Sequence, residues 1–300
     1  MTVNGEPDAR ALRADAPIGV FDSGIGGLTT VRELFARLPH ESVVYFGDTA
    51  RLPYGNKSKE TITRFSLEIA SFLARQHVKC IVVACNTASS HALEVLRERL
   101  GVPVIGVIEP AARAAVAASP HGRIGVVGTL ATVGSNAYGD AIARLAPGAQ
   151  VHQRACPLFV PLVEEGWLDH PVTRQVADEY LAELQRADLE SLILGCTHYP
   201  LLAPLLGEAM GPRVTLVDSG AEAAAATAAL LGARGLLAPA AGRPGHHFFL
   251  SDEPRRRSFA RVAESFLGRP LPAVTVVDQT DLPWFERPQA AAAHAKGGPA

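Results

Sequence analysis

The chain has 300 residues, of which 48% are apolar and 19% charged, and its formal net charge is −2. This length exceeds what one hydrophobic core usually supports, so we expect two domains or one large α/β unit, and the apolar content excludes a wholly disordered protein. The near-neutral charge provides no global field for a nucleic acid backbone or an anionic membrane, so neither is expected as a partner.

Short apolar runs alternate with longer amphipathic segments along the chain. Runs rich in Ile, Val and Leu are typical of strands buried on both faces, as in parallel sheets covered by helices. These runs are Ile18 to Phe21, Val43 to Phe46, Cys80 to Ala84, Val104 to Val107, Ile124 to Val127, Leu192 to Leu194 and Val214 to Val217. Apolar residues recur at helical spacing in Thr30 to Leu38, Lys59 to Gln76, Ser89 to Leu100, Thr173 to Arg186 and Ala221 to Leu231. The alternation predicts an α/β fold with parallel sheets.

Two pairs of motifs repeat within the chain. Ile18-Gly-Val-Phe-Asp-Ser23 is similar to Ile124-Gly-Val-Val-Gly-Thr129, and Ile81-Val-Val-Ala-Cys85 is similar to Leu192-Ile-Leu-Gly-Cys196. The offsets of the two pairs are close, which suggests duplicated halves. Ligands of open parallel sheets bind beyond the carboxyl ends of the strands, so two such halves facing each other predict an interdomain active-site cleft.

The ends of the chain and its cysteines indicate a cytoplasmic protein. The first fifteen residues contain no continuous apolar core of the kind that a signal peptide needs, and the Ala-rich stretch around residues 223–240 is too weakly apolar to span a bilayer. We expect a disordered extension over residues 1–15 and a disordered tail over residues 286–300, because both lack a periodic apolar face. The four cysteines are widely spaced without a CxxC pair, so free thiols are expected.

Two of the cysteines stand where a predicted strand leads into polar residues. Cys85 is followed by Asn86 and Thr87, and Cys196 by Thr197 and a histidine. A helix N-terminus after each strand would favour negative charge and is expected to lower the thiol pKa. One such cysteine alone is usually a buried structural residue, whereas two with matched polar neighbours indicate a function.

A glycine-rich turn, Asp22-Ser-Gly-Ile-Gly-Gly-Leu-Thr-Thr30, follows the first predicted strand. Its amides can bind an anion, and with Asp48 after the second strand it resembles a dinucleotide site. Against that interpretation, Thr29 replaces the third glycine, and Asp22 would repel a pyrophosphate. A small zwitterion fits better, because its carboxylate can accept hydrogen bonds from the amides while its ammonium group faces an acidic side chain.

Other candidate groups lie near the second cysteine. His198 is two residues beyond Cys196, so on an extended strand end the two side chains point the same way. Glu164 lies in an apolar stretch where a carboxylate needs a partner, although the sequence does not distinguish it from Glu165. No metal is expected, because no HExxH or CxxC pattern supplies further ligands. The four lysines stand in polar turns, a strand lead-in and the tail, so pyridoxal phosphate is not expected either.

Six motifs read in order resemble the glutamate racemase family, cofactor-independent enzymes that make D-glutamate for bacterial cell walls. The resemblance spans about Pro17 to Phe266. The motifs are Val20-Phe-Asp-Ser-Gly-Ile-Gly-Gly27, Tyr45-Phe-Gly-Asp-Thr-Ala50, Leu52-Pro-Tyr-Gly55, Ala84-Cys-Asn-Thr-Ala88, Gly195-Cys-Thr-His-Tyr-Pro200 and Val217-Asp-Ser-Gly220. The resemblance implies two α/β domains with glutamate bound between them, one formed by residues 16–110 with 218–280 and one by residues 111–217, and a possible homodimer.

The resemblance also implies roles for individual residues. Cys85, assisted by Asp22, would take the α-proton from D-glutamate, and Cys196, assisted by His198 and Glu164, would take it from L-glutamate. The implied substrate-binding residues are Asp22, Ser23, Tyr54, Gly55, Asn86, Thr87, Thr129, Thr197 and His198. Inversion without a cofactor needs one acid or base on each face of the α-carbon, because a single base returns the proton to the face it left. The sequence therefore predicts two cysteines in opposite protonation states.

Three alternatives remain open. A racemase for aspartate or another acidic amino acid would have a similar site. A module that binds a nucleotide or an amino acid would use the glycine-rich turn without chemistry. A thiol hydrolase would use one cysteine with His198 as its base, and would leave the second cysteine without a role.

Overall fold

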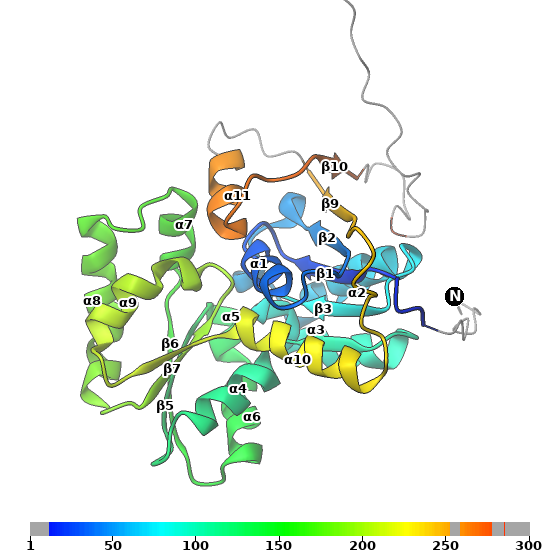
Figure 1. Ribbon diagram of the computed structural model, residues 1–300. Coiled ribbons are helices and arrows are strands. Elements are labelled where there is room, and N and C mark those ends of the chain that lie inside the picture. Colours follow the sequence, from blue (N-terminus) through cyan, green and yellow to red (C-terminus); the bar gives the residue numbers. More distant parts are fainter. Residues whose placement is uncertain (1–11, 253–258, 278–284, 286–300) are drawn as a thin grey trace, which may run out of the picture.

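The computed structural model of the protein describes residues 12–252, 259–277 and 285. Its strands form two sheets, and every pair of neighbouring strands in both is parallel, which confirms the predicted α/β class (Figure 1). The first sheet has the order β10-β9-β2-β1-β3-β4, with β1 (Ile18–Asp22), β2 (Val43–Gly47), β3 (Cys80–Val83), β4 (Val104–Gly106), β9 (His246–Leu250) and β10 (Val274–Val276). The second has the order β6-β5-β7-β8, with β5 (Arg123–Gly128), β6 (Gln150–Ala155), β7 (Ser191–Gly195) and β8 (Thr215–Asp218).

The two sheets share one internal plan. The order β2-β1-β3-β4 of the first sheet matches β6-β5-β7-β8 of the second, so β1 corresponds to β5 and β3 to β7. These are the strands that carry the repeated sequence motifs. Cys85 lies two residues after the end of β3 and Cys196 directly follows the equivalent strand β7, so the two thiols occupy similar places in the two halves. The domain limits inferred from the sequence stay a prediction.

Each face of the first sheet packs against its own helices. Consecutive residues of β1 point to opposite faces of the sheet, so Val20 and Phe21 belong to two different apolar clusters, one on each face. The Phe21 face packs against α2 (Lys59–Arg75) and α3 (Asn86–Arg99). The Val20 face packs against α1 (Leu28–Arg37), α10 (Ser219–Ala233) and α11 (Phe259–Leu267).

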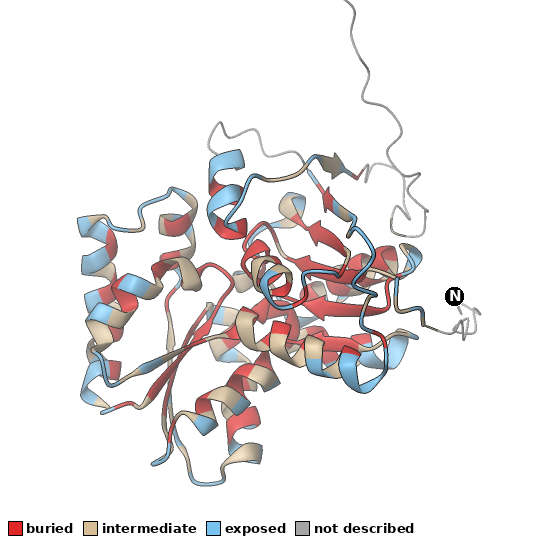
Figure 2. Ribbon diagram, in the orientation of Figure 1, coloured by how far each residue is buried: buried red, intermediate tan, exposed pale blue. Residues whose placement is uncertain are grey.

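The cluster on the Val20 face continues into the second sheet. Figure 2 shows that both sheets contain buried residues. Helix α4 (Ile108–Ala117) packs against α10 as well as against β7 and β8, so it joins the two halves. The remaining helices surround the second sheet: α5 (Leu130–Gly134), α6 (Ala137–Leu145), α7 (Phe159–Glu164), α8 (Pro171–Arg186) and α9 (Ala203–Met210). Three short 3₁₀ helices complete the fold: η1 (Thr49–Arg51), η2 (Tyr54–Asn56) and η3 (Tyr199–Leu202). The shared core holds the strand ends of the two halves in a fixed relation.

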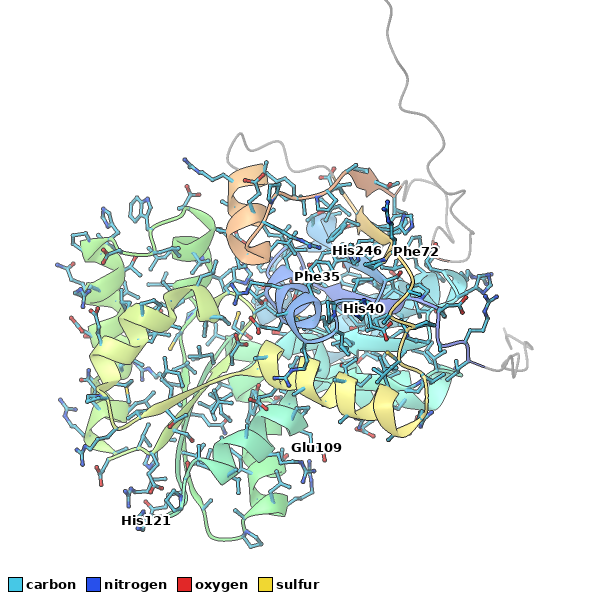
Figure 3. All side chains as sticks on the ribbon, in the orientation of Figure 1. Phe35, His40, Phe72, Glu109, His121 and His246 are labelled. Carbon is cyan, nitrogen blue, oxygen red and sulfur yellow. The ribbon has the colours of Figure 1, made fainter. Side chains whose placement is uncertain are left out.

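Three strands were not predicted from the sequence. Strand β6 is a partly exposed edge strand with a mainly polar sequence, Gln-Val-His-Gln-Arg-Ala, so it lacks the apolar run that marks the predicted strands. Strands β9 and β10 extend the first sheet beyond β2. At the start of β9, the His246 ring lies 4.3 Å from the ring of Phe35 on α1, and this contact helps to hold the added strand (Figure 3).

Most of the two chain ends that were expected to be disordered lies outside the described residues. The predicted tail, residues 286–300, and residues 1–11 of the predicted extension lie outside the described residues. Residues 12–15 enter a turn, and Lys79 Nζ donates a hydrogen bond of 2.6 Å to the carbonyl of Ala14. Within the part of the chain that the structure describes, no helix is long and apolar enough to cross a membrane.

A buried ion pair fastens several segments at the amino end of the first sheet. The Lys79 side chain is fully buried and pairs with Glu41. Its Nζ also donates to the carbonyl of Leu236 at 2.8 Å, and Glu41 Oε1 accepts from the Ala238 amide at 2.8 Å. The pair therefore joins β3, the segment before β2 and the segment after α10, all at the end of the sheet away from the strand ends that carry Asp22 and Cys85.

We expect Lys79→Ala to reduce the free energy of unfolding by about 3–5 kcal/mol, because it leaves the Glu41 carboxylate buried without its counter-charge. Glu94→Ala is the matched control, since Glu94 pairs with Arg97 on an exposed helix face, where loss of an ion pair costs about 0–1 kcal/mol. Urea unfolding of both variants measures the difference. Equal effects of the two substitutions would contradict a structural role for the buried pair.

Candidate active site

The carboxyl ends of the two sheets meet at a buried interface. The turn after β1 contacts the loop after β7: Thr29 Oγ1 donates to the carbonyl of Thr197 at 3.1 Å, and Thr197 Oγ1 donates to Asp22 Oδ1 at 3.5 Å. Asp22, Cys85, Cys196 and Thr197 are all at most 7% exposed. Two surface hollows of about 610 Å³, one along α2 and one between α4 and α10, contain none of the predicted site residues. These four residues of the candidate site are therefore buried where the carboxyl ends of the two sheets meet.

Glycines make this close approach possible. A Cβ atom at Gly26 would lie 2.4 Å from Thr197 Oγ1 and 2.6 Å from the His198 ring. At Gly27, a Cβ atom would lie 2.5 Å from Cβ of Asp22. The glycine-rich turn thus lets the backbone of the first domain touch the loop that follows Cys196, in addition to offering amides: the Gly24 amide donates to Asp22 Oδ2 at 3.0 Å.

Cys85 caps the N-terminus of α3. Its sulfur accepts a hydrogen bond of 3.4 Å from the Ala88 amide and lies 3.6 Å from Ser23 Oγ. The expectation of a lowered pKa is wrong for this thiol: burial, together with the nearby Asp22, raises the pKa of Cys85 to about 12. Loss of hydration disfavours the thiolate more than the helix amides stabilise it. Near neutral pH Cys85 is therefore a thiol, the form that can donate a proton.

Cys196 has a different set of neighbours. Its sulfur lies 3.9 Å from Nδ1 of His198, and Nε2 of His198 lies 3.2 Å from Glu164 Oε1 at the end of α7. The sequence did not distinguish Glu164 from Glu165, and in the structure it is Glu164 that contacts His198. Burial lowers the pKa of His198, but the hydrogen bonds with Cys196 and Glu164 outweigh it and raise the pKa to about 10. A positively charged imidazole therefore stands beside the second sulfur.

Asp22 lies between the two groups of residues. It is fully buried, and burial raises the pKa of its carboxyl, against the opposing effects of the His198 charge and of amides in the glycine-rich turn. Its charge in turn contributes to the raised pKa of Cys85. Asp22 is thus electrostatically coupled to both sides of the interface, whereas the family resemblance implies roles for it in assisting Cys85 and in binding substrate.

The predicted substrate-binding residues fall into two groups. Thr87 and Thr129 lie across the domain interface with 3.0 Å between their hydroxyl oxygens, and Gly55 packs directly against Thr129. Two others make their hydrogen bonds within the protein: the Tyr54 hydroxyl donates to Asp48, and the Asn86 side chain bonds to Tyr138 and Ser219. Their assignment to substrate binding stays a prediction.

The alternative interpretation of Asp48 as a ribose-binding residue loses its basis. Arg51 Nε donates to Asp48 Oδ2 at 2.7 Å, Ser251 Oγ donates to Oδ1 at 2.8 Å, and the Tyr54 hydroxyl donates to Oδ2. Asp48 is fully buried among these groups. Its carboxylate organises the loop that carries Tyr54 and Gly55. Among the described residues, no three His, Cys, Asp or Glu side chains are grouped to hold a metal ion.

Sequence reasoning missed several residues at the interface. Thr132 Oγ1 lies 3.2 Å from Thr87 Oγ1 and 3.0 Å from Thr129 Oγ1, and the ring of Phe266 on α11 lies 5.0 Å from the His198 ring. Ser219 belongs to the Asp-Ser-Gly motif, but the sequence assigned it no role, and Tyr138 belongs to none of the motifs. For Thr132 the sequence did offer an indication, because its spacing from Thr129 places both hydroxyls at the start of the same helix.

Comparisons with known proteins relate the chain to racemases. The model of the Asp/Glu/hydantoin racemase family matches residues 27–227. A glutamate racemase from Geobacter metallireducens is 54% identical over 254 residues, which are 85% of this chain and 93% of the relative. The crystal structure of a glutamate racemase isoform from Bacillus anthracis has a TM-score of 0.84 at 41% identity and covers 89% of this chain and 99% of its own. That of the Francisella tularensis glutamate racemase with D-glutamate has a TM-score of 0.82 at 38% identity, with 88% and 98% covered.

The raised pKa of His198 predicts how stability depends on pH. The pKa rises from 6.5 to about 10 on folding, so the stabilising contribution of the protonated ring is complete below pH 6.5 and is lost as the pH rises to about 10. We expect the difference in free energy of unfolding between the wild type and His198→Gln to shrink across this window. Denaturant unfolding at several pH values measures it. A difference that grows with pH would contradict a charged His198.

Proposed function

The chain belongs to the Asp/Glu/hydantoin racemase family, and from that premise we propose that it interconverts L- and D-glutamate by proton transfer between Cys85 and Cys196 without a cofactor. The protein is an amino-acid racemase, as its relatives indicate. The observation that carries the two-cysteine proposal is the placement of both thiols at equivalent strand ends of facing sheets. Neither a binding module nor a thiol hydrolase accounts for this pairing.

The proposed reaction starts with the removal of the α-proton. In the L-to-D direction the Cys196 thiolate takes this proton, so that the carbon–hydrogen bond breaks and a sulfur–hydrogen bond forms. The His198 imidazolium supplies the counter-charge for the thiolate, and Glu164 holds the ring in place. The electron pair left on the α-carbon is shared with the adjacent carboxylate of the substrate.

The second step delivers a proton to the opposite face of the α-carbon. Cys85 is a thiol near neutral pH, because burial raises its pKa to about 12, so it can donate this proton. The Ala88 amide then stabilises the thiolate that remains. In the D-to-L direction the two cysteines exchange roles, so each must be able to hold either protonation state.

Hydroxyl groups at the interface suit a substrate with two carboxylates. Ser23 lies on the Cys85 side, Thr197 on the Cys196 side, and Thr87 with Thr129 spans the two domains. Fixed donors in an enclosed site stabilise negative charge more strongly than water does. These contacts fit an acidic amino acid, and the glutamate racemases among the relatives support glutamate in particular. The biological role that we propose is the supply of D-glutamate for cytoplasmic steps of peptidoglycan synthesis.

Replacement of either cysteine by alanine is expected to reduce racemisation by about 10²–10⁴-fold, because one face of the α-carbon loses its acid or base. The measurement follows loss of optical rotation and α-proton exchange of L-glutamate in deuterated water, without added metal or pyridoxal phosphate. Absence of exchange by the wild type would overturn the proposal. Faster turnover of L-aspartate than of L-glutamate would assign the enzyme to a different acidic substrate.

Glu164→Gln is expected to lower kcat/KM by about 10- to 100-fold, because a hydrogen bond to a charged group contributes about 1.5–3 kcal/mol. The loss should be equal for L- and D-glutamate, since enantiomers have the same free energy in solution. Glu165→Gln is the matched control, as its neighbour Glu164 is the carboxylate on His198. Equal losses in the two variants would show that the contact between Glu164 and His198 does not assist the reaction.

A further inference from the structure

One buried side chain of the second domain touches the residues next to both cysteines. Tyr138, near the start of α6, is fully buried, and its hydroxyl donates a hydrogen bond of 2.6 Å to Oδ1 of Asn86. Asn86 directly follows Cys85 and is the first residue of α3. This bond therefore crosses the domain interface and ends beside the first thiol.

The ring of the same tyrosine lies against the residue before the second thiol. A Cβ atom at Gly195 would lie 3.1 Å from Cε2 of Tyr138, so the ring packs directly on the backbone there. The same Cβ atom would lie 2.7 Å from the carbonyl of Val127 on β5. The space beside Gly195, at the start of the Cys196 loop, is thus filled by β5 and by the Tyr138 ring.

A chain of hydrogen bonds makes a second connection between the two cysteine loops. Asn86 Nδ2 donates to Ser219 Oγ at 3.1 Å, and Ser219 Oγ donates to the carbonyl of Leu194 at 3.0 Å. Leu194 lies two residues before Cys196, on β7. The side-chain amide of Asn86 is therefore held by two hydrogen bonds: its oxygen accepts from Tyr138 and its nitrogen donates to Ser219.

We propose that Tyr138 and Ser219 are positioning residues that set the separation of the Cys85 and Cys196 sulfur atoms across the substrate. This inference rests on the proposed two-cysteine reaction. Both side chains contact residues adjacent to the cysteines, and they come from two further elements, α6 and the start of α10. Proton transfer depends steeply on the distance between donor and acceptor, so a small displacement of one loop slows the delivery of the second proton.

The test uses Tyr138→Phe, which keeps the ring on Gly195 but removes the bond to Asn86. We expect kcat to fall by about 10- to 100-fold. In deuterated water, the ratio of deuterium in the recovered substrate to deuterium in the product should rise above the wild-type ratio. The reason is that the carbanion stays longer beside the first cysteine, whose proton then exchanges with solvent before it returns.

Ser191→Ala is the matched control. Ser191 is fully buried at the start of β7, the end away from Cys196, and its hydroxyl lies 2.8 Å from that of Ser119. Loss of a buried hydroxyl there lowers stability without moving a cysteine loop. A smaller fraction of folded enzyme reduces the rate in proportion but leaves the deuterium ratio and KM unchanged, so the ratio separates positioning from folding.

The companion variants are Ser219→Ala and Ser219→Thr. We expect the alanine variant to raise the deuterium ratio and the threonine variant, which keeps a hydroxyl for Asn86 and Leu194, to restore it toward the wild-type value. A wild-type ratio in both Tyr138→Phe and Ser219→Ala, as in Ser191→Ala, would overturn the positioning role. A wild type that exchanges no α-proton would instead overturn the proposed reaction.

Discussion

The arrangement of the site depends on the close backbone approach between the turn after β1 and the loop after β7. Gly26 faces Thr197 and His198 at a distance that admits no side chain, and Thr29 fixes the contact with a hydrogen bond across the interface. A Cβ atom at Gly26 would separate the two loops and with them the strand ends that carry the cysteines. The glycine-rich turn, which in a nucleotide-binding protein brings backbone near a phosphate, here brings it near a second domain.

Burial at this interface produces the electrostatic character of the site. Removal of water raises the pKa of Cys85 and of Asp22, and only the partners of His198 reverse the effect of burial on that ring. The low-dielectric surroundings thus keep the Cys85 thiol protonated, whereas the hydrogen-bond partners of His198 keep a positive charge beside the Cys196 sulfur. This difference arises from neighbours rather than from the strands, because the two halves have the same strand order.

The sequence was sufficient for the fold class and for the strands that carry the site, because buried parallel strands have continuous apolar runs. It was not sufficient for β6, whose polar residues suit an exposed edge, or for the pKa of Cys85, since the helix N-terminus was visible in the sequence but the depth of burial was not. Tyr138 and Ser219 were missed for a related reason. Their importance comes from contacts between segments far apart in the chain, and neither residue type nor local spacing reveals such contacts.

The two halves of a racemase site must serve the two enantiomers equally well, but they need not contain the same residues. The substrates are mirror images, so kcat/KM in the two directions must be equal whatever the site contains. The neighbours of Cys85 and of Cys196 can therefore differ, one thiol beside Ser23 and the other beside His198, without favouring either product. In the proposed reaction, each sulfur must still reach its own face of the same carbon. A duplicated fold whose equivalent strand ends face each other meets that geometric demand, and leaves the surroundings of each thiol free to diverge.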